Sequence, residues 1–433
     1  MKQKIQVGNI SLQHFMQKPK TRAGAVFFAL ATILGGAHYI NTSQGSVQAT
    51  GSSFSFGTGG DHGNHAESEA VFQAAANSGL SFFQTNGDLG YYESNANFPA
   101  ANNTQSWCNM VNNKLGTVPF LALSGNHEEP SKEGANGDNI DTVISGGCLP
   151  KPASMNVVES PHKTGNAGTA DTNYGREYYY DYPAVNPLAR VIAISASVNT
   201  YQAGFYDYAT SSSSYNWVKA AIQQAKADGL WVIVVNHHPF INTGSSHGAT
   251  DADTDTYVKD VFNMAIAEKA DLILSGHDHN YQRTKQLKNN IAGCTTFSQN
   301  QYNSNCISNG AATGYTAGEG AVIVLTGSTG GNKKDGNMIN DINTSDPDYP
   351  YFAKVMGSNT GNQTFGFSKF DITSTSITGS YVPGVGQTGG FTDDFTITRS
   401  APADTTKPTV NLVSPAVDAV LTNDAVITAN ASD

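Results

Sequence analysis

The chain carries little charge for its length and has no surplus of basic residues. Charged residues make up 14% of its 433 residues, and the formal net charge is −11. An acidic chain of this kind lacks the basic surface that nucleic-acid-binding proteins present, so we expect no nucleic-acid partner. An anionic substrate has to be attracted instead by a locally positive site, which bound metal ions can provide.

Cysteine is scarce as well. The four cysteines are Cys108, Cys148, Cys294 and Cys306, and they lack the C-x-x-C spacing of a metal-binding knuckle. An even number of cysteines in an exported chain favours disulfides. Of the possible pairings we expect the two local ones, Cys108–Cys148 and Cys294–Cys306, and four free thiols are the alternative.

The N-terminus has the pattern of an export signal. Lys2, Lys4, Lys18, Lys20 and Arg22 precede an apolar run over residues 23–40. A basic segment followed by such a run predicts a secretory signal, and an uncleaved membrane anchor is the alternative. In both cases the rest of the chain is exported. We therefore expect an extracytoplasmic protein that is secreted or attached to the cell surface.

The middle of the chain alternates strand-like and helical patterns. Apolar runs predict strands at residues 54–56, 81–85, 118–123, 191–197, 230–235, 271–274 and 321–325, and a hairpin at 365–372 and 376–382. Helical periodicity appears at residues 67–77, 215–226 and 257–270. This alternation predicts an α/β fold. The Asn/Gly/Ser-rich stretches 289–320 and 332–362 are expected to be irregular loops, and the Gly-rich run after Leu325 lacks the G-K-[ST] ending of a phosphate-binding loop.

The composition changes again near Ala401. A linker-like segment over residues 404–408 precedes strand-like runs at 409–413 and 426–431. This resembles the start of an immunoglobulin-like β-sandwich, which needs about a hundred residues. The chain would then stop inside a domain, and a polar tail is the alternative. The expected organisation is residues 1–49 as signal or anchor plus spacer, 50–400 as the main domain, and 401–433 as linker and truncated β-sandwich.

Metal-binding side-chain types follow several of these strands. A buried strand that ends in an ionisable side chain needs a compensating partner, and metal ions satisfy several such groups at once. The carboxyl ends of successive strands are also the usual position of α/β active sites. The residues in question are Asp61, Asp88, Asn126, His237, His277 and His279. Each motif alone is weak evidence for a metal site. The inference depends on the order of the motifs along the chain and on their positions after predicted strands.

The segments that contain these residues form one set. They are Gly60-Asp61-His62-Gly63, Gly87-Asp88-Leu89-Gly90-Tyr91, Gly125-Asn126-His127-Glu128, Val235-Asn236-His237-His238-Pro239 and Gly276-His277-Asp278-His279. The set resembles the calcineurin-like metallophosphoesterase superfamily and, within it, the purple acid phosphatases. The resemblance covers roughly residues 50–385. It implies a four-layer α/β/β/α sandwich with the site at the carboxyl ends of the strands.

The resemblance also implies a two-metal centre. The first metal would be held by Asp61, Tyr91 and His279, the second by Asn126, His237 and His277, and Asp88 would bridge the two. Many members of the superfamily have a histidine where this chain has Gly63, whereas purple acid phosphatases use the tyrosine that corresponds to Tyr91. A phenolate ligand suits ferric iron. We therefore expect Fe(III) plus a divalent ion, which would be Zn, Fe or Mn, with His65 as a less favoured alternative ligand.

Other residues of the set are expected to act on the substrate. The resemblance implies that His127 stabilises charge or protonates the leaving oxygen, that Glu128 orients His127, and that His247 is a second substrate histidine. His238 is expected to point away from the metals, because neighbours in an extended segment face opposite sides. Arg283 and Tyr281 are expected either to support the ligands or to pack in the core.

The implied reaction is hydrolysis of a small phosphomonoester by metal-activated hydroxide in line with the leaving group. Two alternatives stay open. A phosphodiesterase or nucleotidase could use the same metal-binding scaffold, because the metal ligands do not discriminate between ester types. A non-catalytic surface module with a degenerate site is the other alternative, and it predicts missing ligands.

Overall fold

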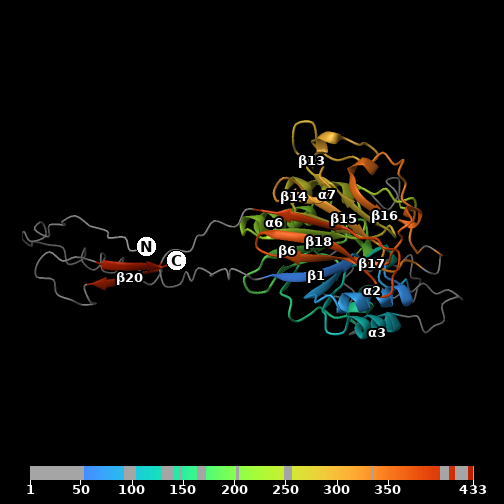
Figure 1. Ribbon diagram of the computed structural model, residues 1–433, viewed down its shortest axis with the longest axis horizontal. Coiled ribbons are helices and arrows are strands. Elements are labelled where there is room, and N and C mark those ends of the chain that lie inside the picture. The colour runs from blue at the N-terminus through green and yellow to red at the C-terminus, as the bar shows by residue number, and fades with distance from the viewer. Residues whose placement is uncertain are drawn as a thin grey trace, which may run out of the picture. The chain divides into compact units, whose positions relative to one another are not determined.

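The computed structural model shows a mixed α/β fold (Figure 1). It describes residues 53–91, 104–128, 140–145, 149–162, 172–200, 204–247, 256–332, 336, 338–399, 409–414 and 428–432. Within the unit Thr50–Ala401, two large sheets form the centre of the fold.

The first sheet has seven strands in the order β14-β19-β18-β17-β1-β2-β3. Its strands are β14 (Gly314–Thr316), β19 (Asp394–Thr398), β18 (Ser376–Pro383), β17 (Gly366–Ile372), β1 (Phe54–Gly59), β2 (Phe82–Thr85) and β3 (Phe120–Leu121). The neighbours β1, β2 and β3 run parallel, whereas β17 is antiparallel to β1 and to β18. The expected hairpin over 365–372 and 376–382 is the pair β17–β18.

The second sheet has eight strands in the order β16-β11-β15-β10-β9-β6-β5-β4. Its strands are β16 (Phe352–Met356), β11 (Tyr281–Thr284), β15 (Val322–Thr326), β10 (Leu272–Ser275), β9 (Trp231–Asn236), β6 (Ala189–Ile194), β5 (Tyr178–Tyr182) and β4 (Val157–Glu159). Its central strands β15, β10, β9 and β6 are parallel, as their continuous apolar runs indicate.

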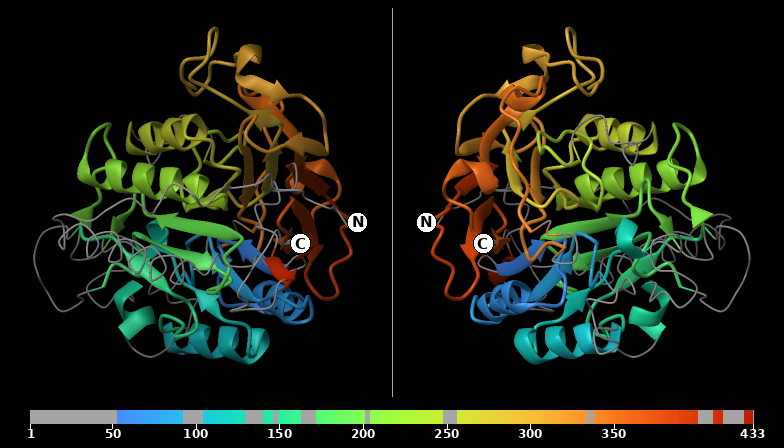
Figure 2. Two further views of the ribbon diagram at one scale, coloured as in Figure 1. Left: turned by 90° about the vertical axis from the view of Figure 1, so that its left-hand side faces the viewer. Right: turned by 90° about the vertical axis from the view of Figure 1, so that its right-hand side faces the viewer.

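Helices cover the outer faces of the two sheets, which gives the expected four layers. The helices α2 (Ala66–Ala76) and α3 (Thr104–Leu115) lie on one side, and α6 (Ser213–Ala227) and α7 (Thr256–Ala267) lie on the other (Figure 2). Successive side chains of β9 point to opposite faces of the second sheet, so this strand contacts the layers on both sides. Ile233 and Val235 belong to the apolar cluster shared with the first sheet, whereas Val232 and Val234 pack with α6 and α7.

Several smaller elements complete the unit. They are α5 (Ile140–Ser145), η2 (Asn126–Glu128), η3 (Ser304–Cys306), η5 (Tyr349–Tyr351), η6 (Ser358–Thr360), β7 (Asn199–Thr200), β8 (Gly204–Phe205), β12 (Gln286–Leu287) and β13 (Ile307–Asn309). The disulfide Cys294–Cys306 forms as expected. Cys108 is also disulfide-bonded, and Cys148, its expected partner, lies outside the described residues.

The two stretches expected to be irregular contain regular structure, so this prediction was wrong in part. Residues 289–320 include η3, β13 and β14, and residues 332–362 include η5, β16 and η6. β14 and β16 are edge strands, each paired on a single side. Edge strands bury few side chains and therefore show little apolar alternation, which is why composition alone did not reveal them.

The C-terminal strands β20 (Thr409–Ser414) and β21 (Thr428–Ser432) pair in antiparallel fashion. The strand expectations at 409–413 and 426–431 agree with this pair. The remainder of residues 401–433 lies outside the described part of the chain, so the immunoglobulin-like sandwich stays a prediction. Among the described residues, no helix is both long enough and apolar enough to span a membrane. The basic and apolar N-terminal segment is not among them.

Arg283 is part of a buried ion pair in the core. Its guanidinium donates to both carboxylate oxygens of Asp393, at 2.6 and 2.8 Å, and to the Tyr315 hydroxyl at 2.6 Å. Tyr281 also donates to Asp393, at 2.7 Å. Of the two roles left open for Arg283 and Tyr281, these contacts favour packing, because they tie β11 to the first sheet.

We expect Asp393→Ala to destabilise the protein by about 3–5 kcal/mol, because it leaves the Arg283 charge buried without its partner. Equilibrium unfolding in urea measures this change. The matched control is Asp394→Ala, since the neighbouring Asp394 is exposed; its cost should stay within about 0.5 kcal/mol. If both variants lowered the free energy of unfolding by the same amount, the buried ion pair would have no special stabilising role.

Candidate metal centre

The residues predicted to bind metal lie just beyond the carboxyl ends of strands from both sheets. In the first sheet, β1 leads to Asp61, β2 leads to Asp88 and Tyr91, and β3 leads to Asn126. In the second sheet, β9 leads to His237, and β10 leads to His277 and His279. The backbone N–H of His277 donates to Asp61 Oδ2 at 2.9 Å, which joins the two sheets at this point.

Asp61, Tyr91 and His279 form one compact group. The Tyr91 hydroxyl lies 3.1 Å from Asp61 Oδ1 and 2.8 Å from His279 Nε2. His279 Nε2 lies 3.5 Å from Asp61 Oδ1. All three side chains are buried. A carboxylate, a phenol and an imidazole at these separations are suited to sharing one cation.

Asn126, His237 and His277 form a second group. The amide oxygen of Asn126 lies 2.9 Å from His237 Nε2 and 3.1 Å from His277 Nδ1. The other ring nitrogen of His237, Nδ1, lies 2.8 Å from the backbone oxygen of Asn86. That contact fixes the ring so that Nε2 faces the cluster, which is the arrangement typical of a metal-binding histidine.

Asp88 lies between the two groups. Its Oδ1 is 3.3 Å from His237 Nε2. The ligand atoms of Asp61, Asp88 and His237 all fall within 4.8 Å of one another, so one acidic side chain is shared between both groups. Asp88 is 1% exposed, so water provides little compensation for its charge.

The protonation of the cluster reflects mutual charge and burial. Burial favours the neutral form of Asp88, but the charges of His237 and His127 outweigh it and hold the pKa of Asp88 well below its usual value. Burial alone would lower the pKa of His237, yet Asp88 raises it to about 9. Burial, together with Asp61 and Asp88, raises the pKa of Tyr91. A bound cation would replace the protons on Tyr91 and His237, so the donor set fits metal ions chemically.

The backbone at these residues is strained. Asp61, Asp88, Tyr91 and His277 have φ values of 61°, 50°, 51° and 75°, in the left-handed region that non-glycine residues seldom occupy. Each such residue costs of order 1–3 kcal/mol, and such strain clusters at functional sites. Four of the seven predicted ligands therefore have an unfavourable backbone conformation. This indicates that the loops are shaped to place these side chains rather than to minimise backbone strain.

Two motif glycines permit the close approach of the loops. A Cβ atom at Gly125 would stand 2.1 Å from Asp88 Oδ1. Gly87 has a φ of 95°, and a Cβ there would lie 2.7 Å from His237 Nδ1. Any larger residue at either position would displace a predicted ligand.

The environment of Gly63 shows why a histidine is disfavoured at this position. Its φ is 68°, and a Cβ would stand 2.6 Å from His65 Nε2 and 2.8 Å from the Gly331 backbone oxygen. The His65 ring nitrogens are already engaged: Nδ1 lies 2.9 Å from Glu67 Oε2, and Nε2 lies 3.1 Å from the Gly331 backbone oxygen. These contacts support the expectation that His65 is not a ligand.

His127 lies beside the cluster and is more accessible than the ligands. Its side chain is 17% exposed, against 2% for Asp88, and its Nε2 lies 3.9 Å from Asp88 Oδ2. The ring packs at 4.5 Å, centroid to centroid, against Tyr91. The His127 backbone N–H donates to Asp88 Oδ1 at 2.8 Å. This position suits a group that meets a substrate bound at the metals.

Glu128 acts on the backbone of the ligand loops. Its carboxylate accepts hydrogen bonds from the N–H groups of Asp88, Leu89 and Gly125, at 3.1, 2.8 and 2.7 Å. Burial and the charge of Asp88 raise the pKa of Glu128 to about 8. Glu128 therefore fixes the loop that carries Asp88, and its expected role in orienting His127 stays a prediction.

His247 reaches the site from the loop after β9. Its ring lies 4.2 Å, centroid to centroid, from His277. Asn242 holds this loop, because its amide nitrogen donates both to the His247 backbone oxygen and to Asp278 Oδ2. Asp278 is buried and also accepts from Asn340 at 2.7 Å. The sequence pattern did not single out Asp278 or Asn242; the carboxylate of Asp278 inside the Gly276-His277-Asp278-His279 motif was the one signal that it offered.

The expectation that His238 points away from the metals was wrong. Its ring lies 4.3 Å from His277 and 5.2 Å from His237, centroid to centroid. The reason is that β9 ends at Asn236, so the strand alternation does not continue through His238. The amide of Asn236 donates to the His238 backbone oxygen at 2.8 Å, which closes a turn here.

The chain is similar in sequence to several known proteins. The family model described as calcineurin-like phosphoesterase matches residues 60–281. Fe(3+)-Zn(2+) purple acid phosphatase 12 of Arabidopsis thaliana is 24% identical over 70% of this chain and 55% of its own length. Purple acid phosphatase 1 of Ipomoea batatas is 23% identical over 66% and 49%. The chain thus spans about half of the length of these curated relatives.

A solved structure shows the same fold. The purple acid phosphatase PPD1 from yellow lupin seeds superimposes with a TM-score of 0.52 at 17% identity, over 81% of this chain and 55% of the lupin chain. This likeness concerns the fold, since the sequences have diverged widely.

Proposed function

Because this chain belongs to the calcineurin-like phosphoesterase family, we propose that it is a dinuclear metal-dependent phosphatase of the purple acid phosphatase type. Its substrates would be small phosphomonoesters. The observation that carries the proposal is the convergence of all seven predicted ligands from five separate strand ends. A degenerate surface module would have lost some of these side chains.

Two bound cations would polarise the phosphoryl oxygens and make a water molecule nucleophilic at moderate pH. The chain's own residues have separate tasks around them. Asp61, Tyr91 and His279 would hold the first ion, Asn126, His237 and His277 the second, and Asp88 would contact both. The remaining histidines would act on the substrate.

His127 is placed to serve the leaving group. It adjoins the bridging Asp88 and is partly exposed, so a substrate oxygen can reach its Nε2. A proton donated from Nε2 would neutralise the charge that develops on the leaving oxygen. His247, held over His277 by the Asn242 loop, would contact the phosphoryl oxygens from the other side.

The phenol of Tyr91 favours ferric iron at the first position, and Zn, Fe or Mn would occupy the second. The Arabidopsis relative bears Fe(3+)-Zn(2+) in its name, which supports this pair. A ferric phenolate absorbs visible light, so the purified protein should be purple. We expect Tyr91→Phe to abolish the visible band while zinc stays bound. A colourless, fully active wild type with two zinc ions would contradict the ferric assignment but not the hydrolase.

We also propose that residues 50–400 are the catalytic domain and that the protein works outside the cytoplasm. The disulfide Cys294–Cys306 supports an oxidising compartment. The N-terminal basic and apolar segment supports export, either as a secreted protein or with attachment at the membrane.

A substrate panel tests the proposed activity. The purified protein is assayed with a phosphomonoester, a phosphodiester and a nucleotide at several pH values. The proposal predicts that the monoester gives the highest kcat/KM, and that Asn126→Ala combined with His127→Ala removes the activity. Preference for the diester or nucleotide would instead favour the alternative enzyme classes on the same scaffold, and retained activity in the double variant would rule out this site.

A further inference from the structure

Three buried imidazoles meet at the second metal position. His237, His238 and His277 each offer a ring nitrogen, and these nitrogens all lie within 4.8 Å of one another. The three side chains are at most 2% exposed. Two of them belong to the ligand set described above. The third, His238, has no role in the proposed reaction so far.

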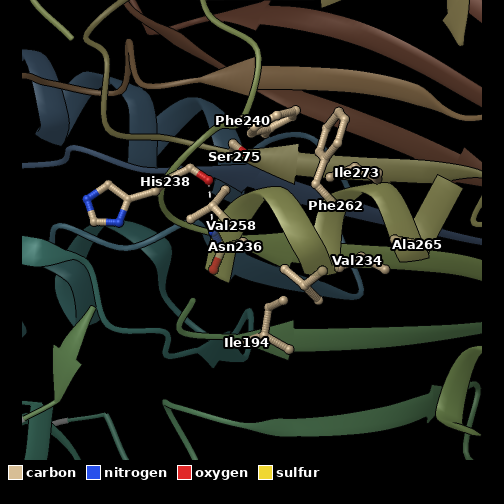
Figure 3. Close-up of a pocket in the computed structure, with 11 residues that line it drawn as sticks. Ile194, Val234, Asn236, His238, Phe240, Val258, Phe262, Ala265, Ile273 and Ser275 are labelled. Carbon is tan, nitrogen blue, oxygen red and sulfur yellow. Dashed lines mark hydrogen bonds between the residues drawn. The ribbon is translucent and has the colours of Figure 1, made fainter. Parts of the chain in front are cut away.

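The His238 ring lies between a largely apolar pocket and the other two histidines. Behind it lies a pocket between the second sheet and α7, lined by side chains such as Phe240, Phe262 and Ile273. Figure 3 shows the His238 ring turned away from these apolar side chains. Most of the residues that line this pocket are apolar, and apart from His238 itself Asn236 and Ser275 are the polar ones.

The turn after β9 sets this orientation. Asn236 accepts the Ala196 N–H at 2.8 Å and donates to the His238 backbone oxygen at 2.8 Å. The turn therefore presents two consecutive histidine rings to one cluster, where an extended strand would have separated them. The rings of His238 and His277 meet at an interplanar angle of 81°.

We propose that His238 is a third imidazole ligand of the second metal ion. This inference rests on the proposed function, because it concerns one of its two ions. It would give that ion three neutral nitrogen ligands in addition to the Asn126 oxygen and the Asp88 carboxylate. Imidazole suits zinc, whereas manganese prefers carboxylate, carbonyl and water oxygens, so the second position should select zinc over manganese.

The test compares His238→Gln with His247→Gln in the full chain. Both histidines touch His277, but only His238 is in the three-nitrogen group. Each protein is loaded with iron and titrated with zinc, and the zinc dissociation constant is measured by calorimetry. Zinc-edge X-ray absorption counts the imidazoles around the ion. Circular dichroism before loading checks that both variants are folded, and His238→Asn provides a second substitution if His238→Gln is not.

We expect His238→Gln to weaken zinc binding by more than about 100-fold, beyond what loss of a group that merely supports a ligand usually costs. The zinc spectrum should lose one imidazole. His247→Gln should leave both the zinc affinity and the imidazole count unchanged. Wild-type zinc binding with an unchanged spectrum in His238→Gln would overturn the proposal.

Weaker binding in His238→Gln with an unchanged imidazole count would also overturn it, because His238 would then act by supporting His277 from outside. Measurements on the wild-type protein separate the test of His238 from the test of the proposed function. If the wild type binds two ions and hydrolyses phosphomonoesters, only the role of His238 is at stake. If the wild type binds no second ion, the proposed function itself fails.

Discussion

Asp88→Asn is expected to reduce phosphatase activity by about 10³-fold or more. The substitution removes the one negative charge shared by both predicted metal positions, and metal ions supply several kcal/mol of transition-state stabilisation, where each 1.36 kcal/mol is tenfold in rate. The neutral amide should also release at least one ion. Steady-state kinetics and elemental analysis of the same preparation measure both effects.

The control for this prediction is Asp394→Asn, which changes an exposed aspartate at the start of β19. It should keep full activity and both metals. If Asp88→Asn retained two ions and near-normal kcat, Asp88 would not bridge the ions and the assignment of the two groups would have to be redrawn.

His127→Ala is expected to lower kcat by about 10²–10⁴-fold, the usual contribution of a positioned acid or base. Metal content should not change, because His127 contacts Asp88 and Tyr91 without belonging to the ligand set. The variant therefore separates loss of proton transfer from loss of metal, which Asp88→Asn cannot do.

The choice of substrate sharpens this result. An aryl phosphate with a good leaving group needs little protonation of the leaving oxygen, whereas an alkyl phosphate needs much. His127→Ala should therefore impair the alkyl substrate far more than the aryl one. An equal loss for both substrates would assign His127 to stabilising the phosphoryl group rather than the leaving oxygen.

The sequence pattern located the strand ends that carry the candidate ligands, because each of these residues follows a strand-like run. The strands β9 and β10 are nearly continuous apolar runs, β1 and β2 each begin with buried phenylalanines, and parallel strands bring their carboxyl ends to one edge. The motifs, taken in their order along the chain, then indicated which residues would be the ligands. That the two sheets meet at this edge, with Asp61 bonded to the His277 backbone, is long-range packing that no local pattern reveals.

The features that the sequence pattern did not reveal depend on tertiary packing or on where a strand ends. α3 has weak helix formers such as Asn109, Asn112 and Asn113, and it forms because Trp107 and Val111 are buried in the core. His238 was placed on the wrong side because alternation was extended past the end of β9. The Asn242–Asp278 contact joins residues 36 positions apart, so it became visible only in three dimensions.

The most direct test of the two-metal centre is a reconstitution titration. Metal is removed from the full-length protein with a chelator, and iron and zinc are added back in measured equivalents while phosphomonoester hydrolysis is followed. We expect no activity in the metal-free protein and a rise that saturates at two equivalents per chain. Full activity without metal, or saturation at one equivalent, would show that the site does not hold two catalytic ions.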